Sequence, residues 1–441
     1  MPKKLSLTLL LLVMLAVSRS VSAEETTIPA QTITSKLKME VCIEKGEVPF
    51  EFKKTPGTIK IPECTRRTFE LTGLTEKNVE AYKKEISRLQ IRHVQLRVRF
   101  DAQLKTYVNA GLFADIASLE LGVYDDLTDF TPLAKLQNLT SLNLIRCYWL
   151  TDVTPLTKLQ NLTSLELSGC HCLTDLTLLA KLQNLTSLKV SGVNSSSIGI
   201  SNLTDITPLA KLQNLTSLEL GGCHSLTDLT PLAKLQNLTS LRINGDNGML
   251  AGFVSLKDIT PLTKLQKLIS LELGGFASLT DITPLASLQN LTSLELTGCN
   301  NLTDIAPLAA LRKLTHLDLE GCDELRDLRP LAWLPNLVDL NLQDCKKINT
   351  FYPISGHKKL ERLSLTMPHN DLSFLHNLKQ LKKLYFYGCP KLSNLAPLAR
   401  LQNLEHLIFW DCILVTPLSV AELKKKLPKD CKVYARFPGT I

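Results

Sequence analysis

The sequence predicts an α/β solenoid with a curved parallel β-sheet on its concave side, short helices or 3-10 turns on its convex side, and a cap at each end. Two observations support this prediction. A unit with a period of 23 residues recurs from about residue 92 to about residue 414, and DFTPLAKLQNLTSLNLIRCYWL at 129–150 is 22 residues of one copy. Within each unit, a segment that often begins with Thr-Pro precedes a segment in which apolar and polar residues alternate. Stacked units of this kind share one continuous core, so a single array accounts for most of the chain.

The spacing within the unit defines its type. Leu139, Leu142, Leu144 and Cys147 have the L-x-x-L-x-L-x-x-C spacing of a leucine-rich repeat. Of the thirteen intervals between aligned leucines, ten are 23 residues long, two are 30 and one is 21. The aligned leucines are Leu96, Leu119, Leu142, Leu165, Leu188, Leu218, Leu241, Leu271, Leu294, Leu317, Leu340, Leu363, Leu384 and Leu407.

Each unit is expected to fold as a strand followed by a return path. Successive side chains of a strand point to opposite faces, so Leu142 and Leu144 should be buried and Asn143 should point outward. In the return path, Thr131 is expected to N-cap a short helical turn that has Pro132 at its first position. The aspartates of the recurring L-T-D sequence are expected to bond backbone amides at this turn, and a row of calcium ligands is the alternative.

The segments outside the array suggest export and capping. Residues 1–23 have the pattern of a secretory signal peptide cleaved after Ala23, and no later stretch is long and apolar enough to span a membrane. We therefore expect a secreted or periplasmic mature chain. Its N-terminal cap is predicted at 24–91, with short strands and an amphipathic helix that begins at Thr75. The repeat array follows at 92–414. The C-terminal cap is predicted at 415–441, with a helix at 419–427 and a final strand.

Eight cysteines lie five residues after an aligned leucine: Cys147, Cys170, Cys223, Cys299, Cys322, Cys345, Cys389 and Cys412. Their common register favours a ladder of buried thiols over a metal or redox array, although disulfides between adjacent turns are also compatible with the spacing. Cys42 and Cys64, outside the register, are the candidate disulfide. Cys170, His171 and Cys172 are the one local cluster of metal-ligand types, and we expect no metal or other cofactor there.

Sequence motifs of catalysis are missing, and the charge is modest. The chain has no H-E-x-x-H, G-x-S-x-G, P-loop or G-x-G-x-x-G after a strand, which predicts that it is not an enzyme and has no catalytic residues. The formal net charge is +8, and three of the positive charges lie in residues 1–23; the remaining charge of about +5 is too weak to predict a nucleic-acid partner.

Outward positions on the concave face are the candidate binding residues. Two units carry insertions after the strand, within 193–202 and 246–255, and inserted loops on a rigid scaffold commonly carry recognition. The centre of the predicted site consists of Glu166, Lys189, Glu219, Arg242 and Glu272, together with Asp246, Met249, Leu250 and Phe253 of the second insertion. Toward the C-terminus the candidates are Arg362, Lys383, Tyr385, Tyr387, His406 and Trp410. Aromatic and cationic side chains are enriched at binding hot spots; the alternative is that Tyr387 and Trp410 pack under the C-terminal cap.

The repeated sequence D-[IL]-T-P-L-A-x-L-x-N-L-T-x-L-x-L resembles the repeats of bacterial internalins, and the turn G-C-x-x-L-T-D resembles the cysteine-containing repeat class. This resemblance covers about residues 92–434. It implies a solenoid that binds a ligand, usually a protein, through its concave face. The resulting hypothesis is a non-enzymatic recognition protein for a protein or glycan ligand. Two alternatives are an enzyme or enzyme inhibitor that acts through the inserted loops, and a structural component of the cell envelope.

Overall fold

The computed structural model describes most of the repeat array and parts of its flanks. The described residues are 31–35, 40–45, 48–54, 57–61, 66–71, 74–75, 77–170, 172–192, 203–223, 225–245 and 256–436. The predicted signal peptide, Cys64, His171, Asp246, Met249, Leu250 and Phe253 lie outside these residues. The signal peptide and the disulfide between Cys42 and Cys64 therefore stay predictions. The chain divides into two compact units, Met1–Leu144 and Ile145–Ile441.

Unit 1 begins with antiparallel strands and continues into the first parallel turns. Its elements are β1 (Gln31–Ser35), β2 (Glu40–Lys45), β3 (Val48–Lys54), β4 (Gly57–Ile61), β5 (Arg66–Glu70), α2 (Val79–Arg88), β6 (His93–Phe100), α3 (Asp101–Asn109), β7 (Ser118–Asp126), the 3-10 helix η2 (Thr131–Lys135) and β8 (Ser141–Ile145), the last residue of which belongs to unit 2. β1 pairs with β4, and β2 pairs with both β3 and β5, all antiparallel. β5, β6 and β7 then pair in parallel, so the parallel sheet of the array begins at β5.

The two α-helices of unit 1 differ from the sequence prediction. The predicted amphipathic helix is present, with Tyr82 and Ile86 buried, but it begins at Val79 instead of Thr75. The Asn78 side chain accepts a hydrogen bond from the amide of Thr75 at 2.7 Å, so a turn occupies the residues before the helix. The helix α3 was not predicted. It forms in the first copy because its nine residues contain neither proline nor glycine and bury Leu104, Tyr107 and Val108 on one face.

Unit 2 is a regular parallel stack. Its strands are β9 (Ser164–Ser168), β10 (Ser187–Ser191), β11 (Ser217–Gly221), β12 (Ser240–Asn244), β13 (Ser270–Gly274), β14 (Ser293–Glu295), β15 (His316–Asp318), β16 (Asp339–Leu342), β17 (Arg362–Leu365), β18 (Lys383–Tyr387), β19 (His406–Trp410) and β20 (Lys432–Arg436). Its helices are η3 (Thr154–Lys158), η4 (Thr177–Lys181), η5 (Thr207–Lys211), η6 (Thr230–Lys234), η7 (Thr260–Lys264), η8 (Thr283–Ser287), η9 (Ala306–Ala310), η10 (Arg329–Trp333), η11 (Tyr352–Ile354), η12 (Ser373–Asn377), η13 (Ala396–Arg400) and α4 (Pro417–Lys424).

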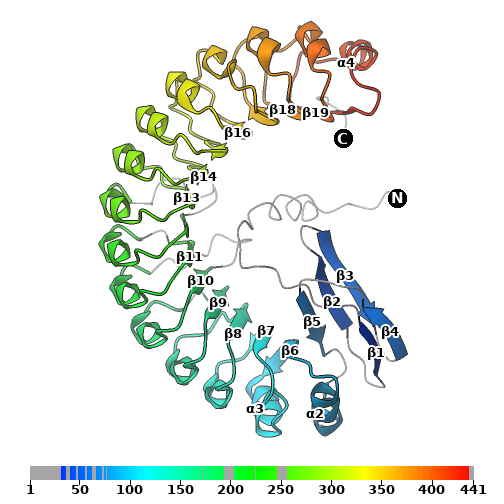
Figure 1. The fold of residues 1–441 in the computed structure, drawn as a ribbon, viewed down its shortest axis with the longest axis vertical. Coiled ribbons are helices and arrows are strands. Elements are labelled where there is room, and N and C mark those ends of the chain that lie inside the picture. The colour runs from blue at the N-terminus through cyan, green and yellow to red at the C-terminus, as the bar shows by residue number, and fades with distance from the viewer. Residues whose placement is uncertain are drawn as a thin grey trace. The chain divides into compact units, whose positions relative to one another are not determined.

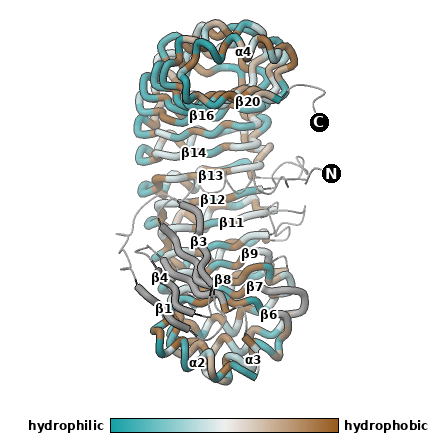
Figure 2. The backbone as a smooth tube through the Cα atoms, turned by 90° about the vertical axis from the view of Figure 1, so that its right-hand side faces the viewer, coloured by the Kyte–Doolittle hydropathy of each residue, from teal (hydrophilic) through white to brown (hydrophobic). Residues whose placement is uncertain are grey.

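Neighbouring strands of unit 2 pair in the register that the aligned leucines predict. Leu218, for example, is the Cα partner of Leu188 on one side and of Leu241 on the other. The strands line the inner side of this unit and the 3-10 helices its outer side, and strands β11 to β14 lie one above the other (Figures 1 and 2). Along β9, β11 and β12, buried and half-exposed residues alternate. The predicted leucine-rich repeat solenoid of the α/β class is thereby confirmed.

The return path is stabilised by the aspartate of L-T-D. In unit 2 the Oδ1 atom of Asp228 accepts a hydrogen bond from the amide of Thr230 at 2.7 Å. The equivalent aspartates of other repeat copies make the same contact at 2.7–2.9 Å. The prediction that these aspartates bond backbone amides is confirmed. The prediction that Thr131 is an N-cap is wrong: Phe130 occupies that position, and Thr131 is the first residue of η2, with its amide donating to Asp129 at 2.8 Å.

The eight cysteines in common register are buried and free, so the predicted thiol ladder is confirmed. Five of the eight thiols donate to a backbone carbonyl of the preceding turn, namely those of Cys299, Cys322, Cys345, Cys389 and Cys412. The thiol of Cys345, for example, donates to the Leu319 carbonyl at 3.0 Å. Burial raises the pKa of the Cys223 and Cys299 thiols to about 12. Because thiolate is the reactive form, these side chains are poor nucleophiles and poor metal ligands.

The C-terminal cap consists of α4 and β20. The helix begins two residues before the predicted start because Thr416 caps it: the Thr416 hydroxyl accepts from the Ser419 amide at 3.1 Å, while the Ser419 hydroxyl accepts from the Thr416 amide at 3.0 Å. The helix ends at Lys424, before the predicted end at 427. The predicted final strand is present as β20, which extends the parallel sheet beyond β19. Among the described residues no helix is long and apolar enough to cross a membrane.

Candidate binding surface

The five central residues predicted from the sequence lie side by side on neighbouring strands. Glu166, Lys189, Glu219, Arg242 and Glu272 occupy the same register position on β9 to β13 and form one row across the sheet. The four predicted residues of the second insertion lie outside the described residues, so the structure relates none of them to this row.

The cations of this row are paired with its own carboxylates. The Lys189 ammonium lies 3.4 Å from Glu166 and 3.3 Å from Glu219, and the Arg242 Nε lies 2.5 Å from a Glu272 oxygen. These pairs hold the long cationic side chains against the sheet. A partner that bound either cation would have to compete with these carboxylates.

The row continues as an acidic cluster on the next two strands. Glu295 on β14 and Asp318 on β15 follow Glu272 in register, and Asn341 on β16 donates hydrogen bonds to Asp318 and to Glu320, both at 3.0 Å. Burial, followed by the negative charges of Glu272 and Asp318, raises the pKa of Glu295 to about 7. Burial also raises the pKa values of Asp318 and Glu320. This part of the surface therefore changes charge near neutral pH.

The C-terminal candidates form a second and chemically different surface. We define the C-terminal concave surface as the outward residues of β18, β19 and β20, which pair in three rows. These rows are Lys383, His406 and Lys432; Tyr385, Ile408 and Tyr434; and Tyr387, Trp410 and Arg436. The sequence analysis identified Lys383, Tyr385, Tyr387, His406 and Trp410 as candidates. It missed Lys432, Tyr434 and Arg436, although the alternation in the predicted last strand could have revealed them once that strand was paired with β19.

Aromatic side chains on this surface remain accessible. Trp410 is 38% exposed and Tyr434 is 55% exposed. The guanidinium of Arg436 lies 4.8 Å from the centroid of the Trp410 ring, in the geometry of a cation–π contact. The alternative that Tyr387 and Trp410 pack under the C-terminal cap is met in part at Trp410, because Arg436 of the cap lies over its ring while the side chain stays 38% exposed. Tyr387 is half-buried, with its ring centroid 6.5 Å from that of Tyr385.

The remaining C-terminal candidate, Arg362 on β17, differs from its neighbours because it is paired. Its guanidinium lies 2.8 Å from a carboxylate oxygen of Asp339 on β16. Lys383, which is its Cα partner on β18, belongs to the C-terminal concave surface. Arg362 thus marks the border between the acidic and the cationic parts of the concave face of unit 2.

Among the residues that the structure describes, no group of three or more histidine, cysteine, aspartate or glutamate side chains is arranged to hold a metal ion. Cys170 belongs to the buried ladder, and Cys172 is half-exposed.

Comparisons with known proteins agree with the fold. A family model described as leucine-rich repeats (2 copies) matches residues 266–310 and 289–333. No curated protein matches the chain. Among solved structures, the chain is similar to an internalin (InlF) of Listeria monocytogenes, with 27% identity, 75% of this chain and 89% of that chain covered, and a TM-score of 0.57.

Two further structures from the same organism have lower TM-scores. Internalin C2 is 32% identical, with 47% of this chain and 82% of that chain covered and a TM-score of 0.37. The functional domain of InlJ, described as including a cysteine ladder, is 17% identical, with 72% of this chain and 62% of that chain covered and a TM-score of 0.42.

Proposed function

Since the chain is a bacterial leucine-rich repeat protein of the internalin-like type, we propose that it is a non-enzymatic recognition protein that binds a protein ligand through the concave face of its sheet. Repeat proteins of this kind mediate protein recognition. To this general property the proposal adds the kind of ligand, the face that binds it and the cellular location of the protein.

The observation that carries the proposal is the composition of the C-terminal concave surface. Its nine outward side chains contain four aromatic rings and three side chains that are cationic at neutral pH, and none of the nine is acidic. Rigid aromatic side chains contribute large contact areas at little cost in conformational entropy, which explains their enrichment at hot spots. A partner segment with acidic and apolar side chains would complement this surface.

The central row of unit 2 has a different role in the proposal. Its cations already pair with its own carboxylates. We therefore assign this row to the edge of the contact, where its charges would guide the approach of the ligand, and not to the binding hot spot. The predicted contribution of Asp246, Met249, Leu250 and Phe253 stays part of the proposal, because their insertion follows β12, a strand of the same sheet.

The test of this function is to use the immobilised chain as bait and to identify the proteins that it captures from cell-envelope and culture fractions. The bait is the chain without residues 1–23, and the variant is Trp410→Ala. The matched control is Trp333→Ala, because Trp333 is also exposed, at 58%, but lies on the 3-10 helix η10. A protein that binds the unmodified chain and the Trp333→Ala variant, but binds Trp410→Ala at least tenfold more weakly, supports the proposal. Equal binding by all three baits contradicts the assignment of the surface.

We also propose that the mature protein acts outside the cytoplasm. The sequence of residues 1–23 supports export, and the burial of the ladder thiols would protect them from oxidation there. N-terminal sequencing of protein recovered from the periplasm or the medium should begin at Glu24. Retention of the full-length chain in the cytoplasm would argue against this location.

A further inference from the structure

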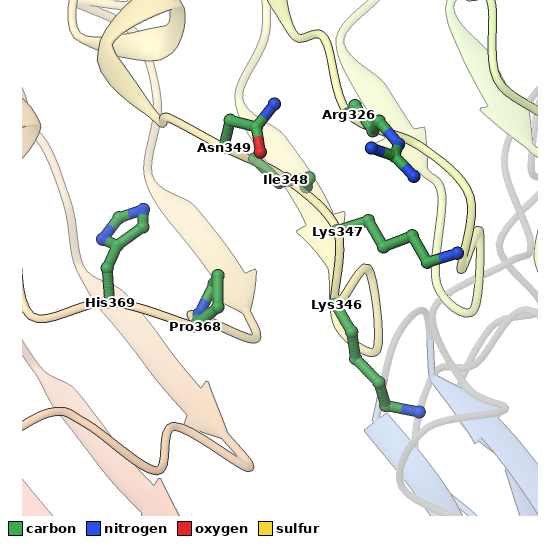
Figure 3. Close-up of a pocket in the computed structure, with 7 residues that line it drawn as sticks. All are labelled: Arg326, Lys346, Lys347, Ile348, Asn349, Pro368 and His369. Atoms are coloured by element: carbon green, nitrogen blue, oxygen red, sulfur yellow. The ribbon is translucent and has the colours of Figure 1, made fainter.

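A pocket of about 360 Å³ lies outside the concave rows, on the turns that follow strands β15 to β17. It is lined by Arg326, Lys346, Lys347, Ile348, Asn349, Pro368 and His369. Pro368 and His369 form one side, Arg326 and the two lysines form the other, and Asn349 and Ile348 lie between them (Figure 3). The lining contains three cations and no carboxylate. Its size is within the range of small-ligand sites.

The pocket is located at the one shortened copy of the repeat. Nine residues separate Leu363 from Leu372, whereas eleven separate Leu384 from Leu395 in the following copy. The hydrogen bonds between the two turns identify the matching residues, because the Asn370 side chain accepts from the amide of Ser393 at 2.9 Å and donates to its hydroxyl at 3.0 Å. The residue before Asn370 is His369, and the residue before Ser393 is the buried Leu392. An imidazole therefore stands where the regular repeat has a leucine.

The hydrogen bonding of His369 leaves one buried donor without an acceptor. Its Nδ1 atom accepts a hydrogen bond from the amide of Asp371 at 3.4 Å. In the neutral ring this contact puts the proton on Nε2. Nε2 is buried and has no hydrogen-bond partner among the described residues. The ring itself is held by an edge-to-face contact with Phe351, with 5.7 Å between the ring centroids.

The cationic side chains that line the pocket differ in whether a neighbouring carboxylate already pairs with them. Lys347 pairs with Glu324, and the Lys346 ammonium lies 3.6 Å from Asp323 and 3.8 Å from Asp344. In Figure 3 both lysine side chains extend away from His369. The guanidinium of Arg326, in contrast, makes no salt bridge or side-chain hydrogen bond with the part of the chain that the structure describes, although its charge contributes to lowering the pKa of Glu324. A planar guanidinium with five donors is well suited to oxyanions.

We propose that this pocket binds a tetrahedral oxyanion, a phosphate or sulfate group. Arg326 supplies two parallel donors, the Nε2–H of His369 supplies a third from the opposite side, and the exposed side-chain amide of Asn349 supplies a fourth from between them. The paired lysines add positive charge on one side. A tetrahedral group directs its oxygens to several sides and can meet donors from separate turns, whereas a carboxylate directs two oxygens within one plane.

The test is a titration of the chain without residues 1–23 with inorganic phosphate, sulfate and acetate at constant ionic strength, followed by calorimetry and by the melting temperature. The variants are Arg326→Gln and His369→Leu, the second of which introduces the residue of the next copy. Arg329→Gln is the matched control, because Arg329 is three residues away and already paired with Asp327 at 2.7 Å. We expect phosphate or sulfate to bind the unmodified chain and Arg329→Gln equally, and to bind Arg326→Gln and His369→Leu at least tenfold more weakly.

Two results would overturn the proposal. One is an equal response of all four proteins, which would reduce the effect to general salt stabilisation. The other is acetate binding as tight as phosphate binding, which would exclude the preference for a tetrahedral group. Phenyl phosphate and phenyl sulfate distinguish the source of the anion: tighter binding of the esters points to a group carried on a larger molecule, and weaker binding points to the free ion.

Discussion

Glu272 and Glu295 lie directly opposite each other on the adjacent parallel strands β13 and β14. Both side chains are largely buried, and burial raises both pKa values. Arg242 partly counteracts this effect at both groups, and each group has a second acidic neighbour, Glu219 for Glu272 and Asp318 for Glu295. The concave face of unit 2 therefore holds two adjacent carboxyl groups whose pKa values are raised above those of exposed glutamates.

The first prediction concerns pH. The pKa of Glu295 is raised from 4.5 to about 7 in the folded protein. The stability that results from this shift is fully present below pH 4.5 and is lost as pH rises through 7. Over this interval Glu295 should lower the free energy of unfolding by at most about 3 kcal/mol. Urea unfolding at pH 5, 6, 7 and 8 measures the effect.

Substitution separates Glu295 from the other titrating groups. Glu295→Gln should make the stability less dependent on pH between 5 and 8 and should raise it at pH 8. Glu219→Gln serves as the control, since Glu219 already pairs with Lys189. An unchanged pH dependence in Glu295→Gln would show that Glu295 is ionised at no cost in the folded protein.

The second prediction concerns the inward and outward faces. Leu218→Asp puts a charge at a position that is 1% exposed, where even Leu→Ala typically costs about 2–5 kcal/mol, and it should unfold the central turns. Glu219→Gln, one residue later, removes a half-exposed ion pair and should cost about 1 kcal/mol or less. Circular dichroism melting curves compare the two, and similar melting would contradict the assigned faces.

The third prediction concerns the thiols. In the native chain the eight ladder cysteines should react slowly with a thiol reagent, because they are buried and burial raises the pKa of thiols such as Cys223. The half-exposed Cys172 and Cys431 should react first. Denaturation without reductant should then release the ladder thiols. If denaturation released almost none, the turns would have to be cross-linked by disulfides.

The fourth prediction concerns an asparagine ladder that the sequence analysis did not identify. The Asn237 amide donates to the Gln213 carbonyl of the preceding turn at 3.0 Å, and Asn214 and Asn290 make the equivalent contact. Asn237→Ala should cost about 1 kcal/mol in chemical unfolding. Gln236→Ala, which alters the neighbouring exposed side chain, should cost measurably less; equal losses would attribute the effect to the local backbone.

The repetitive part of the fold was predictable because one rule applies at every turn. The place of the aligned leucine within its motif, as at Leu188, Leu218 and Leu241, determines both the strand register and the buried face, and the longer copies keep this register. The capping prediction at Thr131 failed because the helix begins one residue earlier than predicted, with Phe130 at the N-cap position. Asp129, two residues earlier, reaches the Thr131 amide, which leaves the threonine inside the 3-10 helix.

The candidate site was less predictable, because it depends on contacts between copies. The sequence indicates that Lys189 points outward but not that Glu166 and Glu219 pair with it. Likewise, Tyr434 lies on the concave face because β20 pairs with β19. This strand follows the last copy of the repeat, so the repeat period does not predict its pairing. The pocket at His369 results from a local shortening, and periodic analysis treats such a deviation as an irregularity.

The backbone bonds between successive turns have a mechanical consequence. The amide of Thr239 donates to the Thr216 carbonyl, and the amide of Ile269 donates to the Thr239 carbonyl, so that each turn of unit 2 is attached chiefly to its immediate neighbours. A tension applied to the two ends of unit 2 is then carried by the turns in series. Each 23-residue turn that peels away releases about 80 Å of extended chain. Under load, unit 2 would lengthen stepwise as an extensible tether, with the turns that have not yet detached still folded.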